Sequence, residues 1–352
     1  MSESSAMNFC SDNVTGVAPE IMQALAEANH GTAWPYGNDD WTRRIEGQLA
    51  EIFERKVRAF PLATGTATNS LALACMCPPY AAVLAHEAAH VMVDECAAPE
   101  FYTGGAKLIP VAGPNGKMTE AGVAAALAKW RSTDPHQVPL AAISLTNATE
   151  SGTVYRPDEV AAIARLAKAA GLRVHMDGAR FANAMAFLGV PAKAVTWEAG
   201  IDALSFGATK GGAMAAECVV FFDDKLAESF AYRRMRGGHL VSKMRFVSAQ
   251  LNAFFADGLW LKLARHANAM AQRLAQGLSR IPGARLIHPV EANELFVVLP
   301  PAVIAGLREA GAEFYDWAGE PNLIRLVTAW ETEPAKVERF LKIAQEVAAK
   351  AA

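Results

Sequence analysis

Lys210 has the setting in this sequence that most strongly suggests covalent chemistry. It ends an apolar, strand-like stretch, residues 201–209, and Gly211 and Gly212 follow it. Glycine adds no side chain, so a turn with two glycines lets a ligand approach the backbone closely. A lysine withdrawn from water becomes an amine nucleophile for carbonyl compounds. The alternative is a surface lysine in a turn, and Lys210 considered alone would favour that alternative.

A carboxylate partner for this lysine follows another apolar stretch, near residues 172–174. Residues 175–180 read His-Met-Asp-Gly-Ala-Arg, which places Asp177 at the end of a second strand candidate. Enzymes that use pyridoxal 5'-phosphate (PLP) need this pair, because the lysine forms a Schiff base and the aspartate keeps the pyridine nitrogen protonated. The pair therefore predicts PLP as the cofactor, with Lys210 as its anchor.

A site for the cofactor's phosphate is predicted at residues 64–69, which read Thr-Gly-Thr-Ala-Thr-Asn. This segment lies between a strand candidate and a helix candidate, so backbone N–H groups at Gly65 and Thr66 would be exposed at a helix N-terminus, where phosphates bind. An ordinary glycine turn with a threonine cap is the alternative. The order of this segment, Asp177 and Lys210 along the chain favours the phosphate site.

Strand and helix patterns alternate through the first 250 residues. Seven strand candidates cover residues 57–62, 82–85, 107–111, 140–145, 172–176, 203–206 and 218–222, and helical patterns cover residues 67–75, 89–97, 119–130 and 157–170. Such alternation is typical of an α/β fold. It predicts a large PLP-binding domain with a mostly parallel, seven-stranded sheet between helices.

The pattern changes near residue 250. A long helical pattern covers residues 249–281 with a break near Gly258, followed by strand candidates at 285–287, 295–299 and 323–327 and helices at 302–310 and 334–349. A chain of 352 residues is long enough for two domains. We expect residues 1–250 to form the N-terminal segment and large domain, and residues 251–352 a smaller C-terminal α+β domain.

Composition excludes several classes of protein. The formal net charge is −3 and no dense Lys/Arg block occurs, which argues against nucleic-acid binding. Neither a signal peptide nor an apolar membrane span is predicted. The five cysteines are scattered and odd in number, which indicates reduced thiols in a cytoplasmic protein.

Five motifs, in order along the chain, resemble the PLP-dependent threonine aldolases of low specificity, which belong to the fold type I superfamily of aspartate aminotransferase. They are residues 9–15, 36–40, 64–69, 175–180 and 323–328. The resemblance implies a cytoplasmic lyase that cleaves L-threonine, L-allo-threonine and related β-hydroxy-α-amino acids, such as phenylserine, to glycine and an aldehyde. A dedicated phenylserine aldolase, a β-eliminating lyase and a non-enzymatic interaction protein remain as alternatives.

The resemblance also implies roles for single residues. Lys210 would form the Schiff base, Asp177 would pair with the ring nitrogen and Gly65 and Thr66 would donate to the phosphate. The remaining assignments are a contact with the cofactor's phenolic oxygen (Arg180), binding of the substrate carboxylate (Ser11 and Arg325), a place in the substrate pocket (Tyr36), and a phosphate contact in this or a neighbouring subunit (Arg236). The family further implies a homo-oligomer, commonly a homotetramer built as a dimer of dimers.

Histidines supply the candidate proton carriers. Residues 86–90 read His-Glu-Ala-Ala-His, which matches the helical zinc-peptidase signature HExxH. A zinc site needs a helix and a third ligand in a suitable context, so we predict no metal. In the aldolase interpretation His90 stacks on the cofactor ring, and His136 lies near the substrate hydroxyl or is a solvated loop residue. The base remains open between His90, His136 and water.

Overall fold

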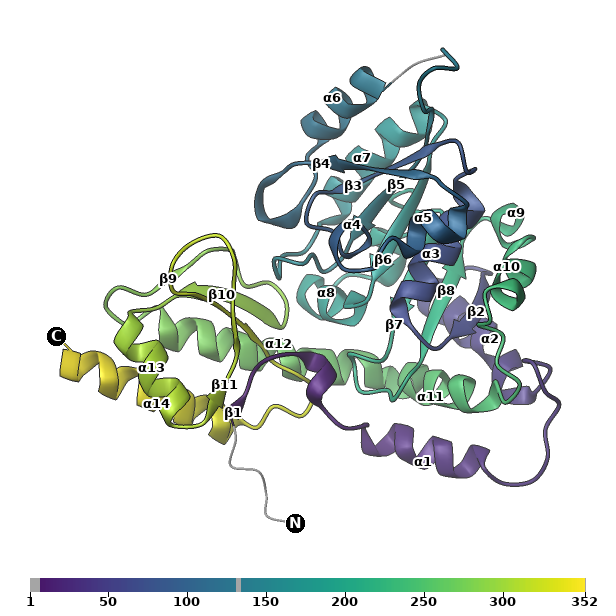
Figure 1. Cartoon of the computed structure of the whole chain (residues 1–352). Helices are drawn as coiled ribbons and strands as arrows, with labels where there is room; N and C mark the ends of the chain where they lie inside the picture. Colours follow the sequence, from purple (N-terminus) through teal and green to yellow (C-terminus); the bar gives the residue numbers. More distant parts are fainter. Residues whose placement is uncertain (1–6, 131–133, 352) are drawn as a thin grey trace.

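The computed structural model describes residues 7–130 and 134–351. Its centre is a seven-stranded sheet in the order β2-β8-β7-β6-β5-β3-β4 (Figure 1). Only β8 runs antiparallel to its neighbours, so the prediction of a mostly parallel sheet is confirmed. The bounds of the strands are β2 (Arg58–Leu62), β3 (Ala82–His86), β4 (Lys107–Val111), β5 (Leu140–Thr146), β6 (Arg173–Gly178), β7 (Ala203–Gly207) and β8 (Glu217–Phe221).

Helices cover both faces of this sheet, because strands of a parallel sheet present apolar side chains to both sides. One face packs mainly against α1 (Pro19–Ala28), α2 (Asp40–Phe53), α6 (Glu120–Trp130), α7 (Pro157–Ala169), α8 (Phe181–Leu188) and α11 (Arg245–Phe255). The other packs against α3 (Gly65–Met76), α5 (Ala98–Thr103), α9 (Asp224–Ala227) and α10 (Phe230–Arg236).

The prediction of a helix at residues 89–97 is wrong. The structure has a single turn, α4 (His90–Val93), and then α5 from Ala98. Cys96 and Ala97 have φ values of 49° and 58°, in the left-handed region. That conformation interrupts a right-handed helix, so the segment turns instead of continuing.

The smaller α+β domain is also confirmed. It contains a four-stranded antiparallel sheet in the order β12-β13-β10-β9. The long helical pattern breaks at Gly258, as expected, where φ is +68°. The elements of this domain are α12 (Leu259–Leu278), β9 (Arg285–Leu286), β10 (Glu294–Val298), α13 (Pro301–Glu309), β11 (Ala312–Glu313), β12 (Tyr315–Asp316), β13 (Leu323–Val327) and α14 (Pro334–Ala351).

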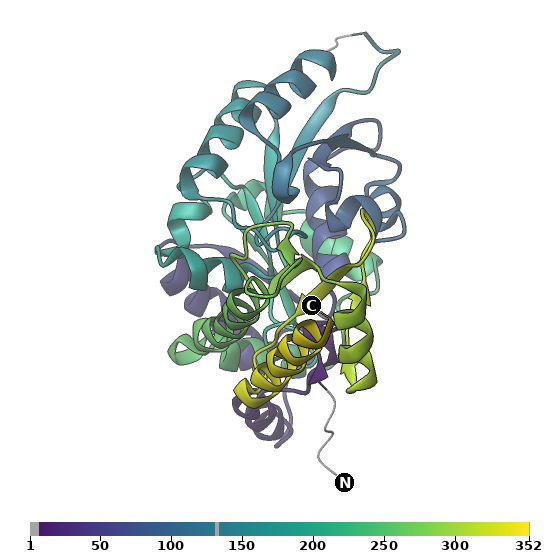
Figure 2. The ribbon, with the colours of Figure 1, turned by 90° about the vertical axis from the view of Figure 1, so that its left-hand side faces the viewer.

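Hydrophobic packing crosses the expected domain boundary in two places, and the division at residue 250 stays a prediction. Strand β1 (Met7–Asn8) pairs with β11, and Met7 and Phe9 are buried in the core of the small domain. Helix α12 contributes its first turns to the large core and its later turns to the small one. In Figure 2 the C-terminal helix α14 (yellow) lies in front, and the large sheet extends above and behind it.

Phe206 on β7 lies at the centre of the large core. Its ring is within 5.4 Å, between centroids, of Phe181, Phe255 and Trp260. We expect Phe206→Ala to lower the free energy of unfolding by roughly 3–5 kcal/mol, because it leaves a cavity in a close-packed interior. Urea unfolding followed by circular dichroism measures this loss. Tyr315→Ala, at a half-exposed site on the small sheet, is the control. Equal losses in the two variants would contradict this account of the core.

Candidate active site

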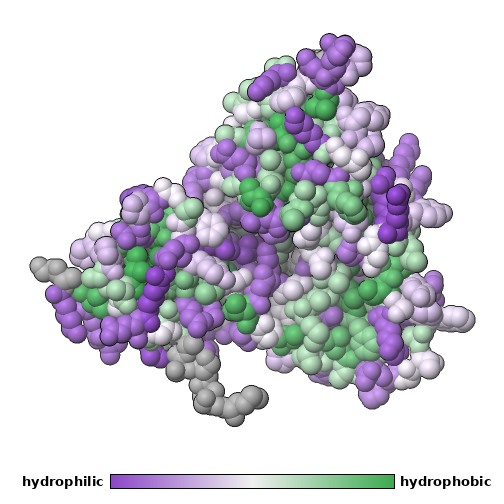
Figure 3. All heavy atoms as spheres, viewed as in Figure 1, coloured by the Kyte–Doolittle hydropathy of each residue, from purple (hydrophilic) through white to green (hydrophobic). Residues whose placement is uncertain are grey.

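The predicted cofactor residues converge on one cavity of about 280 Å³ at the carboxyl ends of the parallel strands. Strand directions explain this convergence, because the chain leaves β2, β3, β6 and β7 at the same edge of the sheet. Figure 3 shows hydrophilic residues gathered in the recess between the two domains. Six of the predicted site residues line the cavity, namely Gly65, Thr66, His90, Asp177, Arg180 and Lys210.

Lys210 lies in the turn between β7 and β8. The backbone N–H of Gly211 donates to the carbonyl oxygen of Ala208 at 3.0 Å, and Gly212 has a φ of +116° that L side chains rarely adopt. A side chain at Gly211 would also collide with the ring of Phe254. The two glycines therefore let the turn fold tightly against the core while Lys210 stays on the cavity wall.

Asp177 is 3% exposed and has both carboxylate oxygens held. Oδ1 accepts the backbone N–H of Ala179 at 2.9 Å, and Oδ2 accepts the side-chain amide of Asn69 at 2.8 Å. The same amide donates to Glu95 Oε1 at 2.9 Å. Asn69, from the first turns of α3, thus fixes the position of the carboxylate expected at the ring nitrogen.

The expected phosphate site is the N-terminus of α3. Thr64 caps this helix, with Oγ1 accepting the N–H of Ala67 at 3.3 Å, and Thr64, Gly65 and Thr66 all line the cavity. No atom lies within 4 Å of the position that a Cβ would take at Gly65. This end of the helix therefore faces open space with free N–H groups and a positive end of its dipole, which suits an anion.

His90 is fixed by two carboxylates that the sequence analysis did not single out. Its Nδ1 lies 2.9 Å from Glu95 Oε1, and its backbone N–H donates to Glu150 Oε1 at 2.8 Å. The hydrogen bond to Glu95 raises the pKa of His90, against the opposite effect of burial. No hydrogen bond from the described residues engages Nε2 of His90, which is free to act on a ligand.

Two further carboxyl groups that line the cavity have raised pKa values. Burial, followed by the charge of Asp177, raises the pKa of Glu150 to about 7. Burial also raises the pKa of Glu217 to about 7, while Thr209 and Lys210 act against that shift. One sequence signal was available for Glu217, which opens an otherwise apolar strand.

Arg180 is nine-tenths buried beside the cavity and is held by Asp12. Its Nε and Nη2 donate to the two oxygens of Asp12 at 2.7 and 3.0 Å. Burial by itself would raise the pKa of Asp12, but the charge and hydrogen bonds of Arg180 hold that pKa below its usual range. Arg180 also pairs with Glu294 at 3.3 Å, and Glu294 in turn pairs with Arg325.

Ser11 and Arg325 lie behind this network and do not line the cavity itself. Ser11 adjoins Asp12, and its Oγ accepts the N–H of Asn13, a residue of the cavity wall, at 3.1 Å. The structure therefore brings both predicted carboxylate-binding residues to the neighbourhood of Arg180, through Asp12 and Glu294.

Three predicted site residues lie elsewhere in this chain. His136 precedes β5, at the opposite edge of the sheet from the cavity, and its ring is exposed and pairs with Asp134 at 2.7 Å. Tyr36 is half-exposed, and Arg236 is exposed at the end of α10. This placement matches the solvated-loop interpretation of His136, and neither Tyr36 nor Arg236 is among the described residues that line the cavity.

The zinc-peptidase interpretation does not fit the geometry. His86 ends β3 and His90 begins α4, so no helix carries the two histidines on one face. His86 uses both ring nitrogens, accepting the N–H of Ala88 and donating to the carbonyl oxygen of Gly113. Among the residues that the structure describes, no group of three or more metal-binding side chains is assembled.

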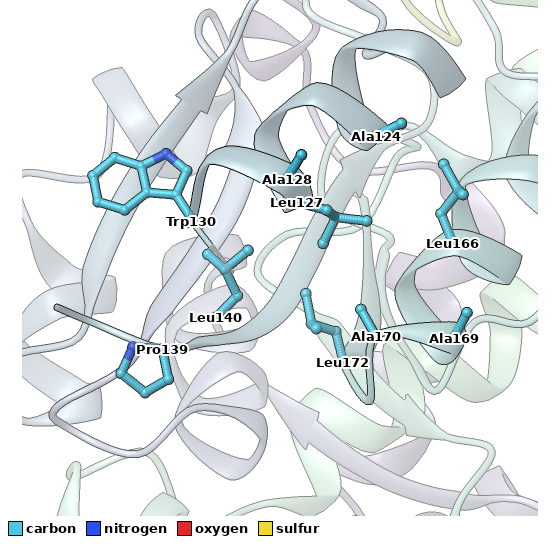
Figure 4. A pocket seen from close by; sticks show the side chains of 10 residues that line it. All are labelled: Ala124, Leu127, Ala128, Trp130, Pro139, Leu140, Leu166, Ala169, Ala170 and Leu172. Atoms are coloured by element: carbon cyan, nitrogen blue, oxygen red, sulfur yellow. The ribbon is translucent and has the colours of Figure 1, made fainter. Parts of the chain in front are cut away.

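A second cavity, of about 450 Å³, lies between α6 and α7 (Figure 4). Its walls are leucine, alanine, proline and tryptophan side chains at the amino ends of β5 and β6, including Trp130, Leu140 and Leu172. None of the described residues that line it is ionisable, so they offer neither a nucleophile nor a proton carrier. The chemistry belongs to the smaller polar cavity.

The polar cavity fits PLP. Lys210 supplies an amine, Asp177 a buried carboxylate for the ring nitrogen and α3 an anion site, on three walls of one cavity. This arrangement on a mostly parallel sheet with a small C-terminal domain defines a PLP enzyme of fold type I. The chain matches the model of the β-eliminating lyase family over residues 8–301 and belongs to that family, with PLP as its cofactor.

The names of similar proteins are consistent with this family. The chain is 44% identical over 335 residues to a low specificity L-threonine aldolase of a Pseudomonas species, covering 95% of this chain and 96% of the relative. It is 43% identical over 339 residues to the low specificity L-threonine aldolase of Pseudomonas aeruginosa, covering 96% of each. The structure of Leishmania major threonine aldolase superposes with a TM-score of 0.91 at 29% identity, covering 97% of this chain and 99% of that one.

Proposed function

We propose that this chain is a low-specificity L-threonine aldolase that cleaves β-hydroxy-α-amino acids to glycine and an aldehyde. The observation that carries the proposal is the single cavity that joins Lys210, Asp177 and the free edge of His90. The identity to named aldolases over nearly the whole chain supports the choice of reaction. L-Threonine, L-allo-threonine and phenylserine are the proposed substrates.

In this reaction the β-hydroxyl loses its proton, the Cα–Cβ bond breaks to release the aldehyde, and a proton returns to Cα to complete glycine. PLP, when bound, supplies the electron sink that makes this cleavage possible. Lys210 would hold the cofactor through its amine, and Asp177 would keep the ring nitrogen in its protonated form. Arg180 lines the same cavity as Asp177 and would contact the cofactor's phenolic oxygen.

Orientation of the substrate decides which bond to Cα breaks, because the bond that lies perpendicular to the cofactor ring is the one that is weakened. We assign binding of the substrate carboxylate to Arg325 and Ser11. Arg325 pairs with Glu294 and Ser11 adjoins Asp12, and both of these carboxylates pair with Arg180. The planar guanidinium of Arg325 suits a bidentate contact with a carboxylate. Fixing the carboxylate leaves the β-carbon and the hydrogen of Cα to compete for that position, and a contact with the β-hydroxyl would favour the β-carbon.

His90 is the proposed base. Glu95 binds Nδ1 and so fixes the ring with Nε2 toward the cavity, where it accepts the proton of the β-hydroxyl. Glu150 fixes the backbone of the same residue. His136 and water were the other candidates, and the exposed position of His136 at the far edge of the sheet favours His90 over it.

Loss of the linking lysine tests the function. We expect purified protein to absorb visible light and to release acetaldehyde from L-threonine and L-allo-threonine and benzaldehyde from phenylserine. Lys210→Ala should lose both the visible band and the activity, while Lys262→Ala, a change at an exposed lysine that pairs with Glu20, should keep both. Kinetics on the three substrates and their D-isomers measure specificity. Release of a 2-oxo acid and ammonia, 2-oxobutanoate from threonine or phenylpyruvate from phenylserine, instead of glycine and an aldehyde would replace the aldolase by a β-eliminating lyase.

The pH dependence tests His90 as the base. Because a base must be neutral, kcat/KM should fall as the pH drops through the raised pKa of His90. Glu95→Gln removes the main cause of that raised pKa, so the acidic limb of the profile should move to lower pH, toward the usual value of 6.5. Glu87→Gln, at an exposed neighbour within the HExxH segment, should leave the profile unchanged. An unmoved limb in Glu95→Gln would exclude this assignment.

A homo-oligomer, built as a dimer of dimers, is the proposed assembly. Large apolar side chains are exposed at Trp34, Tyr36 and Met214, the last only four residues after Lys210. Exposed apolar patches mark surfaces that pack against another chain. In such an assembly Tyr36 and Arg236 would reach the cavity of a neighbouring copy, as each is exposed here.

Light scattering at micromolar concentration should therefore give a mass of a dimer or tetramer, and Trp34→Glu should shift it toward the monomer. A monomeric wild-type protein would contradict the assembly.

A cytoplasmic location is also proposed, supported by five free cysteines. No helix among the described residues is long and apolar enough to cross a membrane. Fractionation of cells tests the location.

A further inference from the structure

Glu294 is a buried carboxylate that stands between two arginines. It opens β10, is 2% exposed and pairs through Oε1 with Nε of Arg325 and through Oε2 with Nη1 of Arg180 at 3.3 Å. Oε2 accepts no hydrogen bond of good geometry from the described residues. Glu294 belongs to the small domain and Arg180 to the large one, so this carboxylate links the domains beside the cavity.

The backbone of Glu294 has little freedom. Its neighbour Asn293 donates to Asp12 Oδ2 at 3.0 Å and to the carbonyl oxygen of Thr328 at 2.7 Å. The carbonyl oxygen of Glu294 packs so closely on Gly152, whose φ is +72°, that a Cβ there would collide with it. The carboxylate is therefore presented from a fixed point on the interface between the domains.

The contacts leave only one edge of Arg325 available. Glu294 takes Nε, and the guanidinium carbon lies 4.9 Å from the ring centre of Trp317, which covers one face. A guanidinium binds carboxylates through two edges, one with Nε and one Nη, the other with both Nη groups. With Nε engaged by Glu294, the edge with the two Nη groups is the one left to receive a ligand carboxylate.

Charge explains why one carboxylate must serve both arginines. Two guanidinium groups brought together in a partly buried site repel each other, and a carboxylate shared between them offsets this repulsion. Removing one member of such a buried group leaves the remaining charge without compensation. Without Glu294, Arg325 loses its anionic partner among the described residues and is free to change the direction of its guanidinium.

We propose that Glu294 is a positioning residue for amino-acid binding. It directs the edge of Arg325 with the two Nη groups toward the substrate carboxylate, and it fixes the position of Arg325 relative to Arg180. This inference rests on the proposed function, since it takes Arg325 as the carboxylate-binding residue. Glu294 itself does not touch the substrate. Its effect is on affinity for the amino acid, through the direction of Arg325, and only secondarily on the bond-breaking step.

Binding of glycine to the holoenzyme tests the inference without requiring cleavage. Glycine is titrated while the visible absorption of the cofactor is followed, and KM and kcat are measured with L-threonine. In Glu294→Gln we expect the glycine dissociation constant and KM to rise about tenfold, the scale of one lost charge-assisted hydrogen bond, with a smaller change in kcat. Glu320→Gln, at an exposed carboxylate paired with Arg285 on the same small sheet, is the matched control.

A double-mutant cycle separates positioning from general damage to the interface. If Glu294 acts through Arg325, then Glu294→Gln adds little to the loss already caused by Arg325→Lys. Fully additive losses, or an unchanged glycine dissociation constant in Glu294→Gln that retains its cofactor, would overturn the inference. Should Glu294→Gln fail to fold, Glu294→Asp, which keeps the charge and retracts it by one methylene, takes its place and should weaken glycine binding in the same direction.

The outcomes also separate this inference from the proposed function. A wild-type protein that binds glycine but cleaves no β-hydroxy amino acid would refute the aldolase while leaving the positioning role measurable. An active aldolase whose glycine affinity does not depend on Glu294 would refute the positioning role and leave the proposed function in place.

Discussion

Every feature of the site depends on where the strands end. In a sheet with parallel strands the carboxyl ends meet at one edge, and the loops that follow them converge on a ligand there. Residues more than 140 positions apart, from Gly65 to Lys210, are brought to the walls of one cavity for this reason. The antiparallel β8 contributes through its first residue, Glu217, because its amino end lies at the same edge.

Crowding charged groups at that edge has an electrostatic cost, and the chain offsets it by sharing partners. One amide, from Asn69, serves both Asp177 and Glu95, and one carboxylate, Glu294, serves both Arg180 and Arg325. Shared partners restrict the motion of side chains that are already paired. Asp12 is shared in the same way: it accepts hydrogen bonds from Arg180 and Asn293, and so connects the N-terminal segment to both domains.

The sequence alone predicted the order of strands and helices, because that order follows from local patterns. It also predicted candidate residues for holding the cofactor, for the same reason. Apolar runs before Asp177 and Lys210 predicted strand ends, and Gly258 predicted the break between α11 and α12. The prediction of a helix at residues 89–97 is wrong because Cys96 and Ala97 adopt left-handed conformations, which the composition of the segment does not signal. The positions of His136, Tyr36 and Arg236 depend on loops, where no periodic pattern constrains the chain.

The sequence by itself determined the α/β fold and the cofactor, and it singled out the lysine and aspartate proposed to hold that cofactor, since strand periodicity and motif order are local properties. Only the tertiary structure decided which carboxylates surround the site. Glu95, Glu150 and Glu294 carry no motif, and they resemble the chain's other glutamates until folding places them next to His90 and the two arginines. Burial and proximity are properties of the folded chain, and they determine the charge and direction of groups whose identity the sequence had already specified.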